Sequence, residues 1–340
     1  MRIVEYTSQN CPLAVELALS FAGRLASDLG AKVTIAPGSR TERRAMSPSL
    51  EGVSTLSHFL DAGKISWSDE PSGEGGLAAL LRGADVVLAD GMAHRAFPDA
   101  GEAIWALVSM RSDAAGEHLD SEFTLSAACG LLDLIGDPER RPLRLGGHQL
   151  AYAGGLSAYM GFTAALCARK AGSRTGLVRV NLADVGVWLN WKSVAMSTWG
   201  ARSASRLGHA AEWRTVRCSD GWTAVVYLEA DWPILRDLID DPRLRDPRFD
   251  DRSVRRANAA LITGAIEDFF IGLSREQLRD LALEKRIPLG PVWSPAELEH
   301  DPQYVARDFL RRVQVGGVAV LRPSAPVIWN GQRFAAGAAS

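Results

Sequence analysis

The sequence predicts an α/β protein with a large domain built on a parallel β-sheet and a smaller α+β domain. Apolar strand runs alternate with helical segments over the first 90 residues, an order typical of parallel sheets with crossover helices. The composition then changes after Trp199, where small and polar residues over 201–214 indicate a linker between two modules.

The alternating pattern at the start of the chain predicts five elements. The expected elements are a strand at 2–5, a helix at 12–29, a strand at 32–36, a helix at 76–82 and a strand at 84–90. Gly30 stands where a helix-ending glycine is expected. Because ligands of such folds usually bind at the carboxyl ends of the strands, we expect a site at that edge.

The middle of the chain predicts further helices. The run 121–135 is apolar and is expected to be helical, and 152–169 is rich in Gly and Ala, which favours a buried helix. Residues 177–189 begin as a strand and continue into a helix. Beyond the linker we expect a strand pair within 218–229, helices at 231–240, 253–272 and 274–285, and an extended segment over about the last 35 residues.

Composition excludes several classes of protein. The chain has 340 residues, 47% of them hydrophobic, and a net charge of -2, which is ordinary for a soluble domain and argues against a polyanion-binding surface. Four widely spaced cysteines form neither a zinc pattern nor a disulfide framework, so we expect no metal site and a reducing, cytoplasmic environment. We also expect no signal peptide and no membrane span.

An ordered set of motifs in the second module is the most specific signal in the sequence. In order, the motifs are Asp220-Gly221-Trp222, Asp246-Pro247-Arg248-Phe249, Arg256 with Asn258, the run IPLGPV from 287, and Asp301-Pro302-Gln303. Together they strongly resemble the class III CoA-transferases, the family of formyl-CoA transferase and carnitine dehydratase. Each motif alone also has an ordinary role in turns and helix caps.

The first module resembles the same family more loosely. The segment 26–38, Gly63-Lys64, the run 84–91 and Thr175-Gly176 with VRVNLADV correspond to family patterns. The resemblance implies the class III CoA-transferase fold: a Rossmann-like large domain of residues 1–200 plus 305–340, and a small domain of 215–304. It also implies a dimer of two interlocked rings.

The family's chemistry depends on an aspartate that the resemblance does not find here. That carboxylate attacks an acyl-CoA thioester to give a mixed anhydride, then an aspartyl-CoA thioester from which CoA passes to a second carboxylic acid. The pattern Asp-x-x-x-Gly, aligned on Gly155 and Gly161, places Ala151 at the aspartate position. Because a methyl group cannot form an anhydride, we expect the standard mechanism to be absent.

Other residues near this gap are candidates for altered chemistry. His148 is a candidate base or nucleophile, with a loop or capping role as the alternative. Glu122 corresponds to a family aspartate and is a candidate carboxylate, although helix-start electrostatics would also explain it. Ser121 stands where the racemase branch has a histidine, which argues against racemase chemistry. Cys129 is read as a core residue.

CoA or an acyl-CoA is the expected ligand, with no covalently bound cofactor. The candidate binding residues are Arg40, Arg43, Arg44, Lys64, Gly146 and Gly147. The cations suit phosphates, and the glycines allow close backbone approach to a thioester. A solvated basic loop and close helix packing are the structural alternatives.

Three functional hypotheses stay open at this point. The chain is a CoA-transferase homologue that binds CoA thioesters with altered catalysis, a non-catalytic subunit of an aspartate-bearing homologue, or a lyase, isomerase or hydrolase on the same fold. Its expected partners are a CoA ester, a carboxylic acid and a second copy or homologue of the chain, with no nucleic acid or membrane.

Overall fold

The computed structural model forms two compact units. Unit 1 comprises residues 1–135, 143–203 and 305–340, and unit 2 comprises 136–142 and 204–304. The residues described are 1–36, 38, 41–67, 74–98, 101–112, 121–174, 176–199, 206 and 212–333. Residues 136–142, which the sequence assigns to the large domain, therefore belong to unit 2.

A six-stranded, entirely parallel sheet forms the centre of unit 1. Its strand order is β5-β2-β1-β6-β7-β8, so the chain runs outward from β1 first in one direction and then in the other, as in Rossmann-like folds. The strands are β1 (Arg2–Tyr6), β2 (Lys32–Ile35), β5 (Ile65–Ser66), β6 (Val86–Asp90), β7 (Ile104–Ser109) and β8 (Leu177–Asn181). The predicted α/β fold is confirmed.

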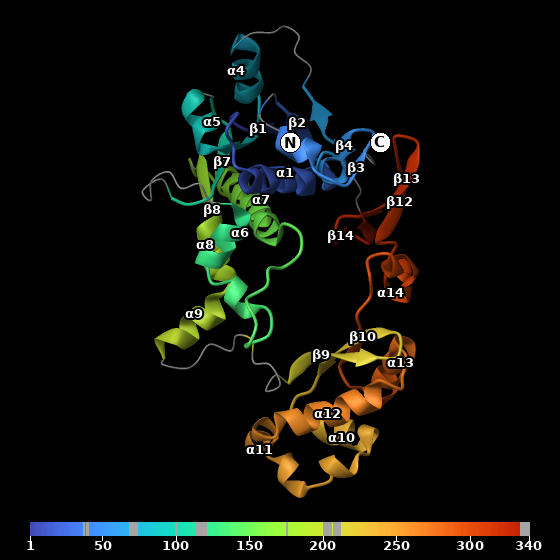
Figure 1. Ribbon diagram of the computed structural model, residues 1–340. Coiled ribbons are helices and arrows are strands. Elements are labelled where there is room, and N and C mark those ends of the chain that lie inside the picture. Colours follow the sequence, from blue (N-terminus) through green and yellow to red (C-terminus); the bar gives the residue numbers. More distant parts are fainter. Residues whose placement is uncertain are drawn as a thin grey trace. The chain divides into compact units, whose positions relative to one another are not determined.

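Helices cover both faces of this sheet (Figure 1). Alternate residues of β6 explain why: Val86 and Leu88 join the core under α1 and α7, whereas Val87 and Ala89 face α4 and α5. A strand buried on both faces reads as a continuous apolar run in the sequence. The helices of this unit are α1 (Leu13–Asp28), α2 (Thr41–Ala45), α3 (Thr55–Leu60), α4 (Glu74–Arg82), α5 (Gly91–Ala96), α6 (Glu122–Ala128), α7 (Gln149–Lys170), α8 (Leu182–Leu189) and α9 (Trp191–Thr198).

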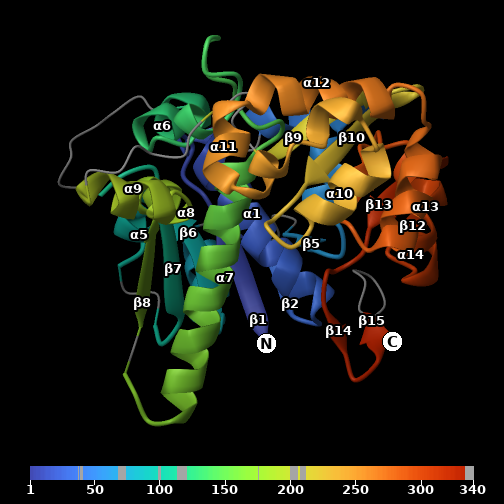
Figure 2. The same ribbon diagram turned by 90° about the horizontal axis from the view of Figure 1, so that it is seen from below.

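Helix α7 is the central helix of unit 1 and runs alongside β7 and β8 (Figure 2). Its glycines allow close approach to α1, because a Cβ on Gly155 would lie 2.5 Å from the Ala18 carbonyl oxygen. Helix α7 is long and apolar enough to cross a membrane by length and composition, yet it contributes Ala151, Ala158 and Phe162 to the buried core. One side of α7 therefore packs in the core of unit 1.

Two small hairpins and a C-terminal hairpin complete unit 1. The additional strands form three antiparallel pairs: β3 (Ser49–Leu50) with β4 (Val53–Ser54), β12 (Leu310–Val315) with β13 (Val318–Pro323), and β14 (Ile328–Trp329) with β15 (Gln332–Arg333). The short helix α14 (Pro302–Ala306) precedes β12 at the division between the two units.

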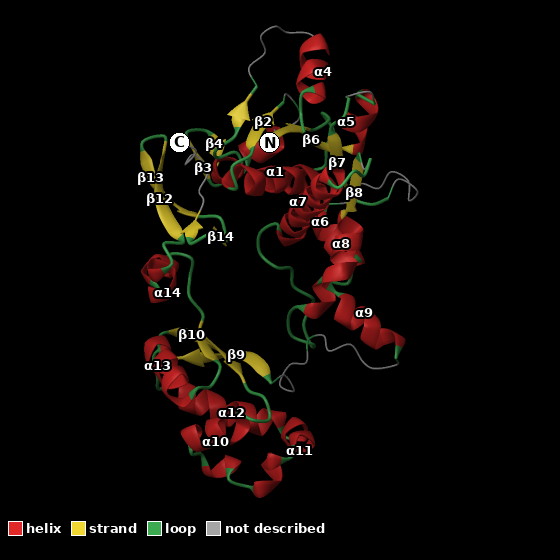
Figure 3. Ribbon diagram, turned by 180° about the vertical axis from the view of Figure 1, so that it is seen from behind, coloured by secondary structure: helices red, strands yellow, loops and turns green. Residues whose placement is uncertain are grey.

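Unit 2 is an α+β module with a three-stranded antiparallel sheet, β11-β10-β9 (Figure 3). Its core includes Val225, Trp232, Phe249, Ile266 and Phe270. The elements are β9 (Trp213–Cys218), β10 (Gly221–Val226), α10 (Trp232–Ile239), α11 (Arg252–Ala257), α12 (Ala259–Phe270), α13 (Arg275–Lys285), β11 (Leu289–Pro291) and the 3-10 turns 242–244, 247–250 and 297–300.

The motifs of unit 2 have structural roles in this fold. Asp220, in the turn between β9 and β10, accepts the backbone N–H of Arg275 at 2.8 Å and so joins the hairpin to the start of α13. Asp246 caps the turn 247–250 by accepting the backbone N–H of Arg248 at 2.9 Å, and this turn buries Phe249 in the core. These two motifs therefore stabilise local structure in unit 2.

Three predicted elements differ from the structure. The helix expected at 121–135 is wrong, because α6 ends at Ala128 and Gly130 adopts φ +75°. The N–H groups of Gly130 and Leu131 bond back to Ala127 and Ser126, which closes the helix in a Schellman motif. The helix expected at 253–272 is divided into α11 and α12, and the strand pair expected in 218–229 spans 213–226.

Candidate functional site

The candidate site lies where α6 and α7 begin. Ser121 caps α6: its hydroxyl accepts the backbone N–H of Thr124 at 3.1 Å, and the Thr124 hydroxyl accepts the Ser121 N–H at 2.9 Å. This capping box fixes the first turn of α6, which contains Glu122. The Glu122 side chain therefore has a defined position next to the start of α7.

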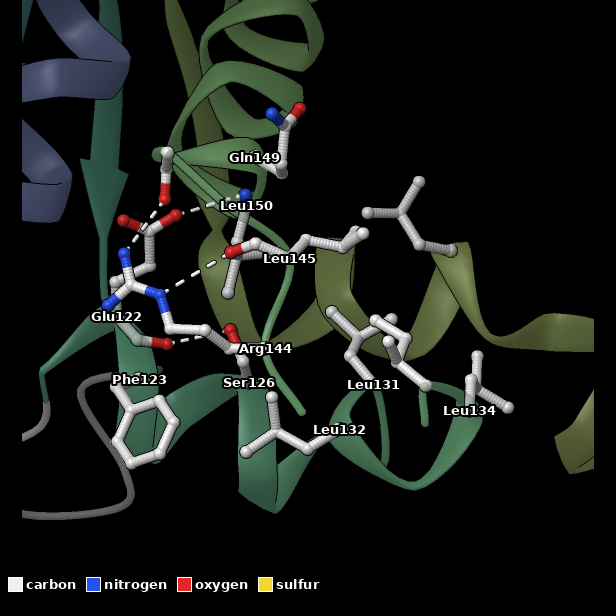
Figure 4. Close-up of a pocket in the computed structure, with 13 residues that line it drawn as sticks. Glu122, Phe123, Ser126, Leu131, Leu132, Leu134, Arg144, Leu145, Gln149 and Leu150 are labelled. Carbon is white, nitrogen blue, oxygen red and sulfur yellow. Dashed lines mark hydrogen bonds between the residues drawn. The ribbon is translucent and has the colours of Figure 1, made fainter. Parts of the chain in front are cut away.

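Glu122 closes the N-terminus of α7. His148 is the residue before this helix and makes no side-chain cap of its own. Glu122 Oε1 accepts the backbone N–H groups of Leu150 and Ala151 at 3.0 and 3.1 Å (Figure 4 shows the bond to Leu150). A carboxylate at the head of a 22-residue helix satisfies free donors and is stabilised by the helix dipole.

The second oxygen of Glu122 binds His148. The distance between Glu122 Oε2 and His148 Nδ1 is 2.7 Å, and the two side chains keep 16% and 20% of their surface exposed. The Tyr152 ring lies 6.4 Å from the His148 ring in an edge-to-face arrangement. Burial, and then the Glu122 charge, raise the pKa of Tyr152. The structure thus brings two separately predicted candidates, Glu122 and His148, into one hydrogen-bonded pair.

Ala151, where the family pattern predicts an aspartate, lies in the first turn of α7 and is fully buried in the core of unit 1. The carboxylate at this helix head comes from Glu122 on α6, since it bonds the N–H of Ala151 itself. Glycines 146 and 147 precede the helix on an exposed segment, and Gly147 adopts φ +73°.

A pocket of about 350 Å³ lies beside the Glu122–His148 pair (Figure 4). Glu122, Ser126, Arg144 and Gln149 supply its polar groups. Six leucines make most of the wall: Leu131, Leu132, Leu134, Leu145, Leu150 and Leu189. We call this site the α6–α7 pocket. The pocket is predominantly apolar, and the side chain of Glu122, which also binds His148, is one of its few polar groups.

The predicted phosphate ligands do not gather in this pocket. The Arg43 side chain is buried and forms ion pairs with Glu16 and Asp61, at 3.1 and 3.0 Å. Lys64 pairs with Glu5 in the interior, where both side chains are fully buried, and donates to the Ser20 carbonyl at 2.8 Å. These placements do not support a phosphate-binding role for either cation.

The other two predicted cations are placed differently. Arg44 is exposed at the end of α2, and Arg40 lies outside the described residues.

Among the residues that the structure describes, no cluster of three His, Cys, Asp or Glu side chains has the arrangement of a metal site.

Comparison with known families identifies the scaffold. The sequence profile of CoA-transferase family III matches residues 114–338, which is two thirds of the chain and includes α6, α7 and unit 2. The chain belongs to CoA-transferase family III. The resemblance seen in the order of motifs is thereby confirmed.

Solved structures agree with this CoA-transferase family III assignment at the level of the fold. A CAIB/BAIF family protein from Brucella suis matches with a TM-score of 0.82 and 22% identity, over 98% of this chain and 93% of that one. A variant of Rv3272 from Mycobacterium tuberculosis with an aspartate replaced by alanine gives a TM-score of 0.78 at 20% identity, over 98% and 92%. No curated protein matches the sequence.

Sequence reasoning missed the pocket of this CoA-transferase family III chain. The run LLDLI at 131–135 was assigned to a continuous helix, which would have placed its leucines on a helix face. Gly130 was the available signal, because a glycine directly after a short helix predicts its end. Arg144 and Leu145 had no recognisable pattern.

Proposed function

We propose that this chain binds a CoA thioester and hydrolyses it with His148 as general base, oriented by Glu122. The observation that supports this most directly is the 2.7 Å bond between Glu122 Oε2 and His148 Nδ1, at the head of α7 and beside the α6–α7 pocket. Family membership supports the CoA thioester as the substrate class.

The bonding of Glu122 favours an orienting role over a nucleophilic one. Its two oxygens accept three hydrogen bonds, from the N–H groups of Leu150 and Ala151 and from His148. A carboxylate held by three donors is stabilised as an anion and is a weaker nucleophile. Acyl storage on this side chain, as on the family's aspartate, would first require those bonds to break.

The same bonding prepares His148 for proton transfer. With its Nδ1–H donated to Glu122, the neutral imidazole keeps the electron pair of Nε2 available as a base. Among the described residues, Nε2 has no hydrogen-bond partner. In the proposed reaction Nε2 takes a proton from water as the water oxygen attacks the thioester carbonyl. The carbon–sulfur bond then breaks, the sulfur receives the proton, and CoA thiol and a carboxylic acid are released.

Two family reactions fit the residues less well. CoA transfer requires a carboxylate that can hold the acyl group, and position 151 is alanine. Racemisation in the family uses a histidine where this chain has Ser121, a residue engaged in capping α6. Hydrolysis needs neither group, which is why we prefer it to CoA transfer and racemisation.

The test is thioester turnover by His148 variants. A panel of acyl-CoA esters is incubated with wild-type protein, His148→Ala and His148→Gln, and release of CoA thiol is followed with a disulfide reagent. We expect kcat to fall about 10²–10⁴-fold in both variants with acyl-CoA binding kept. The control is His300→Ala, an exposed histidine in unit 2. Full turnover in both His148 variants would overturn the proposal.

The non-catalytic alternative has a distinct outcome. If wild-type protein binds acyl-CoA without turnover and co-purifies with an aspartate-bearing homologue, the chain is a structural subunit of that partner. If it binds neither CoA nor acyl-CoA, the proposed ligand class is wrong.

We also propose that the chain forms a dimer with a second copy, as the family resemblance implies. Exposed apolar side chains on α8, on α9 and directly after α9 support this proposal: Trp188, Trp191, Val194 and Trp199 keep 72%, 64%, 44% and 83% of their surface exposed. We call these four residues the α8–α9 face. Aromatic side chains at this density are typical of the buried centre of protein interfaces.

Two finer proposals concern the ligand and the compartment. Of the predicted phosphate ligands, Arg44 is exposed and stays in the proposal as a contact for a CoA phosphate. The four cysteines are free thiols, which supports the proposed cytoplasmic location because reduced cysteines are usual there.

A further inference from the structure

The α6–α7 pocket has a chemical character that the proposed hydrolase activity does not explain. Its wall is made of leucines together with Phe123 and Ile135, and only four residues supply polar side chains. Figure 4 shows Leu131, Leu132, Leu134 and Leu145 among the side chains that line this pocket. A pocket for a small polar acyl group such as formyl would not require this wall.

The apolar surface continues to the mouth of the pocket. Phe123, Leu145 and Leu189 keep 50%, 57% and 43% of their surface exposed. Exposed apolar side chains grouped around a cavity are stabilised when an apolar ligand covers them. The volume of about 350 Å³ lies at the lower end of the range for small-molecule sites, and it is too small for a helix or a protein segment.

We propose that the α6–α7 pocket binds an apolar acyl group of medium length, attached to the CoA thioester on which His148 acts. This inference rests on the proposed function for the position of the thioester. Glu122 both lines the pocket and binds His148, so a chain seated among the leucines has its carbonyl end on the side of the dyad. At roughly 30 Å³ for each water-sized group, the volume accommodates about ten methylene groups.

Chain-length dependence of binding tests the proposal. Dissociation constants are measured by calorimetry for acetyl-, butyryl-, hexanoyl- and octanoyl-CoA with the wild-type chain. Burial of each methylene group is expected to tighten binding by about two- to fourfold, so octanoyl-CoA binds roughly 50-fold or more tightly than acetyl-CoA. Equal affinity across the series would overturn the acyl pocket while leaving the proposed hydrolase activity intact.

A matched pair of leucines provides the control. Leu145 lines the pocket and Leu143 does not, although both lie on the same segment and are 57% and 55% exposed. Leu145→Trp is expected to lower at least tenfold the ratio between the acetyl-CoA and octanoyl-CoA dissociation constants, whereas Leu143→Trp keeps the wild-type ratio. Leu134→Phe narrows the pocket from the segment 131–135 and is expected to act like Leu145→Trp. Identical effects of Leu143→Trp and Leu145→Trp would contradict the assignment.

A thioester without the nucleotide separates this inference from the proposed function. Acetyl and octanoyl thioesters of N-acetylcysteamine are compared by ligand-observed NMR. A preference for the octanoyl compound that Leu145→Trp abolishes supports the pocket even if CoA itself does not bind. No preference for the octanoyl compound overturns the inference directly.

Discussion

Replacing Glu122 by glutamine or by alanine should separate its two roles at the head of α7. Glutamine keeps an oxygen that accepts the N–H groups of Leu150 and Ala151, whereas alanine leaves both donors without their acceptor. An unsatisfied donor costs about 1–3 kcal/mol, and loss of an anion at a helix N-terminus costs about 0.3–1 kcal/mol. Because water reaches this partly exposed site, we expect Glu122→Ala to lower the free energy of unfolding by about 2–4 kcal/mol and Glu122→Gln by about 1 kcal/mol.

For catalysis, Glu122→Gln is expected to be a severe change although it costs little stability. In Glu122→Gln the amide NH₂ faces His148 Nδ1 and donates to it, so the neutral ring must carry its proton on Nε2. The base is then unavailable, and kcat is expected to fall about 10²–10⁴-fold although the fold is nearly intact. Urea unfolding measures the stability change, and ¹⁵N-detected NMR of the histidine ring reports the tautomer.

The control for both measurements is Glu102→Gln, an exposed carboxylate before β7. If Glu122→Ala is as stable as wild type, the carboxylate does not cap α7. If Glu122→Gln keeps wild-type kcat, it does not orient a catalytic base.

Three further predictions concern packing, pH and assembly. Gly155→Ala should destabilise the chain by about 1–3 kcal/mol, because its new methyl group meets the α1 backbone. Gly264→Ala in α12 meets only the end of an arginine side chain at 3.8 Å and should stabilise the chain by about 0.5–1 kcal/mol. Equal changes of the two variants in urea unfolding would contradict the packing argument. The Arg275 guanidinium lowers the pKa of Glu297 from 4.5 to about 2. The ionised Glu297 therefore stabilises the fold above pH 4.5, and this contribution is lost as the pH falls toward 2. Glu297→Gln should lose less stability than wild type between pH 5 and pH 3, and an unchanged acid-unfolding curve would refute this. A Trp188→Ser, Trp191→Ser double variant should be monomeric by light scattering at concentrations where wild type is dimeric, and a persisting dimer would exclude the α8–α9 face as the interface.

Local apolar patterns predict much of the fold because they depend on neighbouring residues only. The runs of β1, β2 and β6 and the glycine after α1 have the positions that the sequence predicts. Strand β7 was missed although Ile104–Ser109 is a continuous apolar run, because the segment between Gly91 and Glu122 departs from the family pattern. Short buried strands of this kind need tertiary context to be distinguished from buried helix.

The candidate site is predictable residue by residue but not as an arrangement. Glu122 and His148 are 26 positions apart, and only the folding of the chain between them brings them within hydrogen-bonding distance. The sequence position of a basic residue can also suggest a ligand-binding role that the structure does not support. Lys64 follows the sheet edge in sequence as a phosphate ligand would, yet Glu5 neutralises its charge inside unit 1. Sequence alone does not indicate which cations are used in buried ion pairs.

Peptide mass spectrometry after reaction with an acyl-CoA that the chain turns over tests the central claim most directly. If His148 activates water at the head of α7, hydroxylamine-quenched samples contain unmodified Glu122 throughout turnover, and product formed in ¹⁸O-labelled water takes up one labelled oxygen while the protein takes up none. A CoA thioester or hydroxamate on Glu122, or labelled oxygen in its carboxylate, would show that this glutamate stores the acyl group and would contradict the account.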